Sequence, residues 1–523
     1  MPRRWKVLAA SAMAACFTSG WLLQRQLAAG GDVYQQARLF ESVLAHVRDY
    51  HVDSIGEPEL YRKATDGMLA ELHDPYAALL AGKDLEKHVE RTTGDYAGIG
   101  LLVDARNGWV TVVSPMPDSP AERAGIRTGD QLFEVDGLPA ADWTLERAVR
   151  AMRGGVGTPI DVAIRRDGAA EPVRFRLVRE RIHQRAVPPG LLLPDGVGFL
   201  SLNIVREHAA RELESEVAKL AEQGMRVLLL DLRSNPGGLR DEAVDIADLF
   251  LDPRQDILVS RGRAPGDDHR WSDYRPQRWP DLPVVVLVSG GTASAAEIIA
   301  GALQDHDRAL IVGDTTYGKG IVQTVFALAP DLALRLTTAR WYTPSGRSIQ
   351  GAALDSAMGT QAEPKAEAYS TGGRRLQASS GLVPDVVLGP DTLTTPESTF
   401  ARSLGGHVPV FRDVLTAYAL ELRKSGAVAS ERFEVTPDMR AEVQRRLRER
   451  GVAIEDSVFG GATRIVDEQL GFEIARYTFG PAAERRRRAA RDSQIQRAVE
   501  LARGTISPQA LLGLAAPASP QAH

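Results

Sequence analysis

Short apolar segments alternate with segments of helical period between Gly196 and Gly313. The segments "RVLLLDL", "PVVVLVSG" and "ALIVG" have the continuous apolar character of strands that a sheet buries on both faces. Between them lie "EAVDIADLFL" and "ASAAEIIAGALQD", which have helical spacing. This alternation predicts right-handed βαβ units and a sheet that is at least partly parallel. In such sheets the site lies beyond the carboxyl ends of the strands.

Three of these strands end in unusual residues. They are followed by "RSNPGG" (233–238), "SGGTASAAE" (289–297) and "GDTTYGKG" (313–320), which we expect to converge. Ser294 begins a predicted helix, where free N–H groups favour a developing oxyanion. The pair Gly237 and Gly238 can present backbone N–H groups at close range. Lys319, in a loop flanked by glycines, could reach the serine. Burial lowers the pKa of a lysine, and the neutral amine can then accept the serine proton.

The same residues allow other interpretations. Gly313 and Gly318-Lys319 fit G-x-x-x-x-G-K, but Gly320 replaces the Ser or Thr of a phosphate loop, and a strand pattern follows instead of a helix. Asp305 and His306 suggest a Ser-His-Asp triad, but "TASAA" lacks the G-x-S-x-G elbow. Taken singly, Ser294 could be a helix cap, Lys319 a solvated lysine and "NPGG" a turn. Only their combination indicates chemistry.

Apolar and polar residues alternate with a period of two, as in β-strands, between about residue 94 and residue 182. "GWVTVVSP", "PIDVAIRRDG" and "EPVRFRLVRE" are predicted strands, with a turn at Asp167-Gly168 and one helix at "LERAVRAMRG". "SPAERAGIRTGDQLFEVDG", which follows "YAGIGLLV", resembles a PDZ domain of the bacterial protease type. The resemblance implies that Gly98, Ile99, Gly100 and Leu101 form a carboxylate-binding loop and an edge strand. A peptide C-terminus would add a strand there.

Taken together, the motifs of this sequence resemble those of the carboxyl-terminal processing, or tail-specific, proteases. The residues that carry the resemblance are "VLLLDLRSNPGG", the run from "LVSGGTASAAE" to "TTYGKGIVQ", "ARWYTPSGRSIQ" and "GLVPDVVL", and it extends from Asp32 to Leu388. It implies a nucleophile at Ser294, a general base at Lys319 and an orienting glutamine at Gln323. An oxyanion hole would use the N–H of Ala295 and one from Gly237 or Gly238. Thr292 and Ala296 stand where this family commonly has serines, and neither is the implied nucleophile.

We therefore expect a multidomain α/β and α+β protein. The expected order is a signal peptide or membrane anchor (1–30), a helical N-terminal domain (31–92), a PDZ domain (93–182), a Ser-Lys protease core of the crotonase and ClpP type (183–390), and a helical C-terminal region with a flexible tail (391–523). The expected activity is that of a serine endopeptidase, which cleaves proteins whose C-terminal tails the PDZ domain binds and which the PDZ domain gates. A catalytically silent PDZ scaffold and a non-proteolytic ligand-binding protein, akin to retinoid-binding repeats, are the rivals.

The first 30 residues determine the expected location. Arg3, Arg4 and Lys6 precede an uncharged run from Val7 to Leu23, which is typical of an export signal or an uncleaved anchor. A lipoprotein site at Cys16 and a buried soluble helix are the alternatives. The remainder is expected outside the cytoplasm, in the periplasm, either anchored to the inner membrane or exported.

Composition limits the partners. A net charge of -5 makes nucleic acid a poor partner, and the run Arg485 to Arg488 is better explained as a solvated helix face than as a site for anionic lipid or nucleic acid. A single cysteine excludes internal disulfides and cysteine-rich metal sites, and we expect neither metal nor cofactor. The expected partners are protein or peptide substrates with exposed C-termini. The family resemblance leaves room for an activating adaptor and for a homo-oligomer that assembles through terminal helices.

Overall fold

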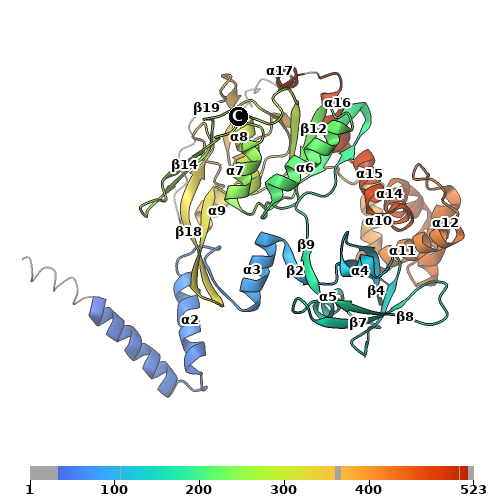
Figure 1. Cartoon of the computed structure of the whole chain (residues 1–523), viewed down its shortest axis with the longest axis horizontal. Helices are drawn as coiled ribbons and strands as arrows, with labels where there is room; N and C mark the ends of the chain where they lie inside the picture. The colour runs from blue at the N-terminus through green and yellow to red at the C-terminus, as the bar shows by residue number, and fades with distance from the viewer. Residues whose placement is uncertain (1–32, 107, 360–366, 506, 516–523) are drawn as a thin grey trace, which may run out of the picture. The chain divides into compact units, whose positions relative to one another are not determined.

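A computed structural model describes residues 33–106, 108–359, 367–505 and 507–515 (Figure 1). Within it the chain divides into two compact units. The smaller unit holds the described residues up to Leu80 together with Val325–Thr337 and Ala357–Gly359, and the larger unit holds the rest. The proposed signal or anchor segment, Cys16 and most of the predicted flexible tail (514–523) lie outside the described residues.

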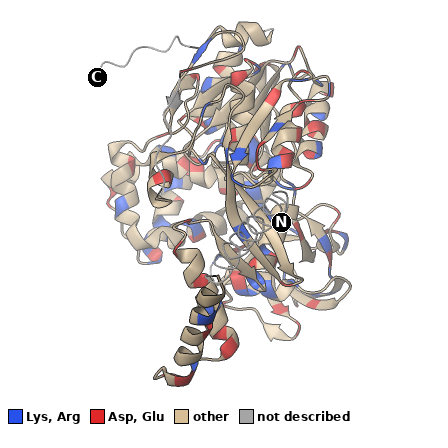
Figure 2. Ribbon diagram, turned by 90° about the vertical axis from the view of Figure 1, so that its left-hand side faces the viewer, with Lys and Arg blue, Asp and Glu red and all other residues tan. Residues whose placement is uncertain are grey.

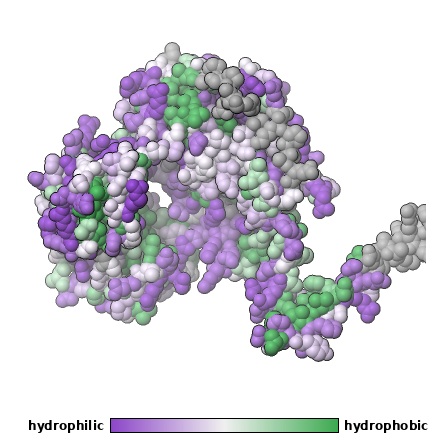
Figure 3. Space-filling model, turned by 180° about the vertical axis from the view of Figure 1, so that it is seen from behind, coloured by the Kyte–Doolittle hydropathy of each residue, from purple (hydrophilic) through white to green (hydrophobic). Residues whose placement is uncertain are grey.

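The smaller unit is built from two helices and a β-hairpin tip. Its helices span 33–50 and α2 (Glu57–Ala70), and the tip belongs to β17 (Ile321–Ala329) and β18 (Leu332–Tyr342). Figure 3 shows apolar side chains gathered over these helices, and several are more than half exposed: Leu39, Phe40, Val43, Tyr50, Val52 and Met68. None of the helices in the described part of the chain combines the length and hydropathy that a membrane span requires.

The predicted PDZ segment forms a sheet of its own. The helix α3 (Lys83–Thr93) precedes it, and β2 (Asp95–Gly98) pairs with β9 (Glu180–His183) where the chain enters and leaves. The sheet order is β3-β4-β5-β7-β8, with β6 paired to β5. Gly168 has φ +83° in the turn between β7 and β8, which confirms the hairpin predicted at Asp167-Gly168. The bounds are β3 (Leu101–Arg106), β4 (Trp109–Pro115), α4 (Pro120–Arg123), β5 (Gln131–Val135), β6 (Leu138–Pro139), α5 (Leu145–Met152), β7 (Pro159–Arg165) and β8 (Val173–Val178).

The alternating segment folds as expected into a mostly parallel sheet, in the order β10-β11-β12-β15-β16-β23. All neighbours from β11 to β23 are parallel, and only β10 is antiparallel. The bounds are β10 (Leu191–Leu192), the 3₁₀ turn η1 (Pro194–Gly196), β11 (Val197–Ser201), α6 (Ala209–Glu222), β12 (Val227–Asp231), α7 (Arg240–Asp248), β15 (Val284–Val288), α8 (Ala295–Asp305), β16 (Leu310–Gly313) and β23 (Val386–Val387).

Alternate residues of these strands enter two separate cores. Leu228, Leu230 and Val286 pack against α6, α7 and α8. Leu229 and Val285 point to the other face, which is covered by α16 (Ser493–Ala502) and α17 (Pro508–Leu512) through Ile495, Ala498, Val499, Ala502 and Leu511. The second cover of the parallel sheet therefore comes from residues more than 200 positions after β15 in the printed numbering.

A second, antiparallel sheet was not predicted. It runs β1-β18-β13-β14 and also pairs β17 with β18, with β1 (Ala78–Ala81), β13 (Asp256–Gly262) and β14 (His269–Ser272). Its strands come from segments that are far apart in the sequence, between Ala78 and Tyr342, so most of their pairing has no local signal. Short elements complete this part of the chain: α9 (Ala352–Ala357), β19 (Ala368–Tyr369), β20 (Arg375–Leu376), β21 (Ala378–Ser379) and β22 (Gly381–Leu382).

The C-terminal region is helical, as expected. Its own core includes Phe400, Phe411, Val466 and Tyr477, all at most 5% exposed. Figure 2 shows charges of both signs interspersed over the larger unit, with no large surface of one sign in that view. The bounds are α10 (Thr395–Leu404), the 3₁₀ turn η2 (Gly405–His407), α11 (Val408–Ser425), α12 (Pro437–Glu449), α13 (Asp456–Gly461), α14 (Thr463–Ile474), the π-turn η3 (Ala475–Phe479) and α15 (Pro481–Arg491).

Candidate active site

The three loops that follow β12, β15 and β16 meet at the carboxyl edge of the parallel sheet. The N–H of Ala293 donates to the carbonyl of Asn235 over 2.9 Å, and the N–H of Tyr317 donates to the carbonyl of Thr292 over 2.9 Å. The Thr292 hydroxyl also donates to the carbonyl of Leu232 over 2.8 Å. The structure therefore brings the glycine pair, the Ser294 segment and the lysine segment together, because parallel strands end at one edge.

Ser294 occupies a strained position at the start of α8. Its backbone has φ 55° and ψ −118°, a positive-φ conformation that costs a non-glycine residue about 1–3 kcal/mol. Ser294 is half-buried, whereas Ala293 before it and Ala295 and Ala296 after it are buried. The Glu297 carboxylate accepts the N–H of Ser294 over 2.8 Å and helps to hold this conformation.

Glu297 links the serine to the lysine. It is 0% exposed, and its oxygen Oε2 accepts both the N–H of Ser294 (2.8 Å) and the N–H of Lys319 (2.9 Å). Oε1 accepts the N–H of Gly318 (2.7 Å) and the hydroxyl of Thr316 (2.5 Å). Burial raises the pKa of Glu297, and these four donors oppose that rise because they favour the ionised form. Sequence reasoning missed this role, although a Glu three residues after a helix-starting Ser is the pattern of a capping box.

Lys319 lies in a loop that requires its glycines. The Nζ of Lys319 donates to Oε1 of Gln323 over 2.9 Å, so the structure brings these two predicted residues together. Gly318 has φ +82°, and a Cβ there would lie 2.8 Å from both the N of Gly381 and the carbonyl O of Ile349. A side chain at position 318 is therefore excluded by both conformation and space.

The two glycines of "NPGG" have different roles. A Cβ on Gly237 would lie 2.8 Å from both the N of Ala295 and the Cβ of Ser294, so this loop packs against the serine. The N–H of Gly237 already donates to Oδ1 of Asn235 over 2.9 Å. Within the segments that the structure describes, the N–H groups of Gly238 and Ala295 have no hydrogen-bond partner. One of these free donors belongs to the glycine loop and the other to the first residue of α8, directly after Ser294.

Asn235 is a further residue that sequence reasoning treated only as part of a turn. It is 0% exposed, and its Nδ2 donates to the carbonyl of Leu202 over 2.7 Å. Next to it in the loop, the Arg233 guanidinium donates to Oδ1 of Asp492 (3.1 Å) and Oε1 of Gln494 (2.8 Å). The glycine loop is therefore fixed from inside the core and from the start of α16.

The structure rejects the Ser-His-Asp alternative. His306 and Asp305 lie at the other end of α8, which at 1.5 Å per residue separates them from Ser294 by about 16 Å. Oδ2 of Asp305 accepts the N–H of Ser345 (2.8 Å), and its Oδ1 pairs with Arg347. Nε2 of His306 contacts the carbonyl of Asp256 over 2.7 Å. Both residues have structural partners instead of Ser294.

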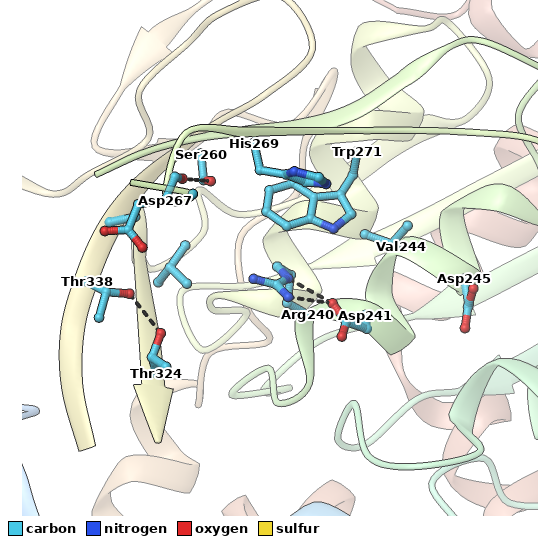
Figure 4. Close-up of a pocket in the computed structure, with 13 residues that line it drawn as sticks. Arg240, Asp241, Val244, Asp245, Ser260, Asp267, His269, Trp271, Thr324 and Thr338 are labelled. Carbon is cyan, nitrogen blue, oxygen red and sulfur yellow. Dashed lines mark hydrogen bonds and ion pairs between the residues drawn. The ribbon is translucent and has the colours of Figure 1, made fainter. Parts of the chain in front are cut away.

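A cavity of about 530 Å³ opens between α7 and the antiparallel sheet (Figure 4). The Arg240 guanidinium lies 4.4 Å from the ring centroid of Trp271, and the His269 ring lies 4.2 Å from it. Thr324 and Thr338 share a hydrogen bond of 2.8 Å on the facing wall. Arg240 comes two residues after Gly238, so this wall continues from the glycine loop.

The four predicted PDZ residues join two strands: Gly98 ends β2, Ile99 and Gly100 form the loop, and Leu101 begins β3. Among the strands that the structure describes, β3 pairs only with β4, so its other edge is open. Gly100 has φ +74°, and a Cβ there would lie 2.3 Å from the Cβ of Ser119. The carbonyls of Ile99 and Gly100 accept the N–H groups of Ala121 (3.0 Å) and Met116 (2.9 Å). The N–H groups of Ile99 and Gly100 have no partner in the described chain.

The arginine run at 485–488 is not a simple solvated face. Arg487 and Arg488 stack on the rings of Phe433 and Phe472, each at 4.1 Å, and Arg486 pairs with Glu431 at 2.8 Å. Arg485 donates to the carbonyl of Pro189 over 2.9 Å. Each of the four guanidinium groups thus has a partner within the chain, because helical spacing turns them toward neighbouring segments.

Comparison with known proteins gives the family. The model of peptidase family S41 matches residues 196–358, and a PDZ-domain model matches residues 111–166. A carboxy-terminal-processing protease of Bartonella bacilliformis is 38% identical over 324 residues, which cover 61% of this chain and 74% of the relative. The chain belongs to the carboxyl-terminal processing proteases of family S41.

Other members of the S41 family are also similar. A probable CtpA-like serine protease of Staphylococcus haemolyticus is 34% identical over 320 residues, which cover 61% of this chain and 64% of the relative. Among solved structures, a photosystem II D1 C-terminal processing protease is 28% identical, with a TM-score of 0.36 and coverage of 67% of this chain and 87% of that one. As an S41 protease with a PDZ domain, the chain has the fold class that the sequence predicted.

Proposed function

We propose that this S41 protease is a serine endopeptidase with a Ser294–Lys319–Gln323 site. The observation that carries the proposal is the position of Glu297, whose single oxygen Oε2 binds the backbone N–H groups of both Ser294 and Lys319. Oε2 of Glu297 thus fixes the backbone of Ser294 and the backbone of Lys319 relative to each other. Gln323 accepts a hydrogen bond from the amine of Lys319 at 2.9 Å. A lysine so placed can accept the proton of a serine as the serine attacks a carbonyl.

The proposed reaction uses one serine, one base and two backbone donors. Ser294 Oγ attacks the scissile carbonyl while the neutral amine of Lys319 takes the hydroxyl proton. The N–H groups of Gly238 and Ala295 stabilise the oxyanion, as free donors beside the attacked carbon. The protonated lysine then donates to the leaving amine, and water releases the acyl group by the same route.

The proposed substrates are proteins outside the cytoplasm with exposed, apolar C-terminal tails. The open edge of β3 can accept a tail as an added strand, and the unpaired N–H groups of Ile99 and Gly100 can bind its carboxylate. Export or anchoring through residues 1–30, gating by the PDZ domain, an activating adaptor and assembly through terminal helices belong to the same proposal. The exposed apolar side chains of helix 33–50 are compatible with membrane association or with assembly.

The test compares hydrolysis of an unstructured protein with an apolar C-terminus by the full chain and by Ser294→Ala and Lys319→Ala. We expect both variants to lose at least about 1000-fold in kcat/KM. Ser272→Ala on β14 and Lys219→Ala on α6 are matched controls that should keep full activity. Cleavage that survives Ser294→Ala would show that the nucleophile is wrong. Tail binding without cleavage by the wild type would support the scaffold instead.

A further inference from the structure

The segment Thr316–Gly320, here called the lysine loop, has nearly every backbone polar group paired. The N–H of Tyr317 donates to the carbonyl of Thr292, and the N–H groups of Gly318 and Lys319 donate to the carboxylate of Glu297. The N–H of Gly320 donates to the side-chain oxygen of Gln350. The carbonyl of Gly318 accepts the N–H of Gly351. Trp341 donates to the carbonyls of both Lys319 and Gly320. A loop bonded in this way has one conformation, so the position of its lysine is set before substrate arrives.

The partners of the lysine loop fall into two groups. Glu297 and Thr292 belong to the segment of Ser294, and they hold the loop from the nucleophile side. Trp341 on β18 and Gln350 hold it from the other side and touch no residue of the Ser294 segment through the hydrogen bonds described. Loss of a bond from the second group would therefore shift the lysine relative to the serine without changing the serine itself.

Trp341 makes two bonds to consecutive residues of the loop. Its indole N–H donates to the carbonyl of Lys319 over 3.0 Å, and its backbone N–H donates to the carbonyl of Gly320 over 2.9 Å. The residue is 1% exposed. A phenylalanine could fill most of this space, but only the indole supplies the donor to Lys319.

Gln350 has one good bond and one unsatisfied group. Its Oε1 accepts the N–H of Gly320 over 2.9 Å, which fixes the orientation of the amide. Its Nε2 is then buried with no partner among the described residues, which is unfavourable because a buried polar group without a hydrogen bond loses its contacts with water. An apolar residue would avoid that cost, so the benefit of this glutamine lies in its bond to the lysine loop.

We propose that Trp341 and Gln350 are positioning residues for Lys319 as general base. The inference rests on the proposed function, because it requires Lys319 to be the general base. Gln323 fixes the amine end of the side chain, and Trp341 and Gln350 fix the backbone from which it starts. Together they set the distance and the angle at which the amine meets the Ser294 hydroxyl.

The test uses Trp341→Phe, which removes the indole donor, and Gln350→Met, which removes the acceptor at nearly constant length. We expect kcat to fall about tenfold in each, with KM unchanged, because misplacement of a base affects only the chemical step. The pH profile of kcat should also move, since the environment of the base changes. Trp279→Phe is a matched control, as Trp279 lies before β15 at the opposite edge of the sheet.

The outcomes separate this inference from the proposed function. Retained activity in Ser294→Ala would overturn the proposed function. A dead Ser294→Ala variant together with wild-type kcat and pH profile in both Trp341→Phe and Gln350→Met would overturn this inference alone. Hydrogen exchange gives a second readout, in which both variants should speed exchange at residues 317–320 while exchange in α8 stays unchanged. If unfolding of Trp341→Phe obscures its kinetics, Gln350→Met and its exchange pattern decide the matter.

Discussion

The PDZ loop and the lysine loop are both rich in glycine, yet their hydrogen bonding is opposite. In "GIGL" (98–101) the N–H groups of Ile99 and Gly100 have no partner within the described chain. In "TYGKG" (316–320) all four N–H groups from Tyr317 to Gly320 are paired. Glycine thus exposes backbone donors in one loop, and in the other it lets neighbouring groups approach closely enough to occupy them.

This difference separates a loop that binds from a loop that positions. Unpaired donors in the PDZ loop can gain a carboxylate partner, so its bonding is completed only by a ligand. In the lysine loop the N–H groups from Tyr317 to Gly320 are all paired, and the Lys319 side chain binds Gln323 outside the loop. The same local composition is therefore proposed to serve two functions, which substitutions at matched glycines can separate.

The largest expected effect comes from Gly318→Ala. The new Cβ would lie 2.8 Å from backbone atoms of Gly381 and Ile349 at a position with φ +82°. We expect kcat/KM to fall about 100-fold or more, because the lysine must move, with tail affinity unchanged. Gly346→Ala is the control, since Gly346 has the same φ of +82° but nothing within 4 Å. Equal losses in the two variants would mean that strain alone, and not loop position, causes the effect.

Glu297→Gln should have the next largest effect. The amide can no longer accept at both of its ends, so at least one of four donors loses its partner in a fully buried place. We expect kcat to fall about 30-fold without loss of tail binding. Steady-state kinetics together with fluorescence anisotropy of a tail peptide would measure both. A variant with wild-type kcat would show that the carboxylate does not tie the two loops.

Gly100→Ala should affect the other loop. Its Cβ would lie 2.3 Å from the Cβ of Ser119 at φ +74°. We expect tail affinity to fall about 30-fold (~2 kcal/mol), while cleavage of a short peptide that does not use the PDZ domain is unchanged. Gly125→Ala, at φ +82° with open space around it, is the control within the same domain. A tail peptide with an amidated C-terminus should mimic the loss in the wild-type protein.

The smallest expected effect is in amide hydrogen exchange. A tail peptide at ten times its Kd should slow exchange at residues 99–101 about tenfold, because the bound state protects these groups. Residues 317–320 should already exchange slowly and should not respond to the peptide. If the peptide instead slowed exchange in the lysine loop first, the assignment of the PDZ loop as the binding loop would be wrong.

The sequence predicted the parallel sheet and the three convergent loops because hydrophobic period and glycine-rich strand ends are local signals. It did not predict the roles of Glu297, Trp341 and Gln350, since each depends on contact with a loop distant in sequence. The continuous apolar strands did indicate that both sheet faces are covered. They could not indicate that Ile495 and Val499 supply the second cover, because the helices near the C-terminus have the same charged pattern as ordinary surface helices. The expected domain boundaries stay predictions.

The cover formed by α16 has a consequence for the synthesis of this protease. Leu229 and Val285 on one face of the parallel sheet lie in a core that Ile495, Ala498, Val499, Ala502 and Leu511 complete. Arg233 of the glycine loop donates to Asp492 and Gln494. A nascent chain that has already exposed every residue of the catalytic site still lacks one wall of its core. The loops at the edge of this sheet therefore reach their final packing only after residues 492–511 have been synthesised and have folded onto it.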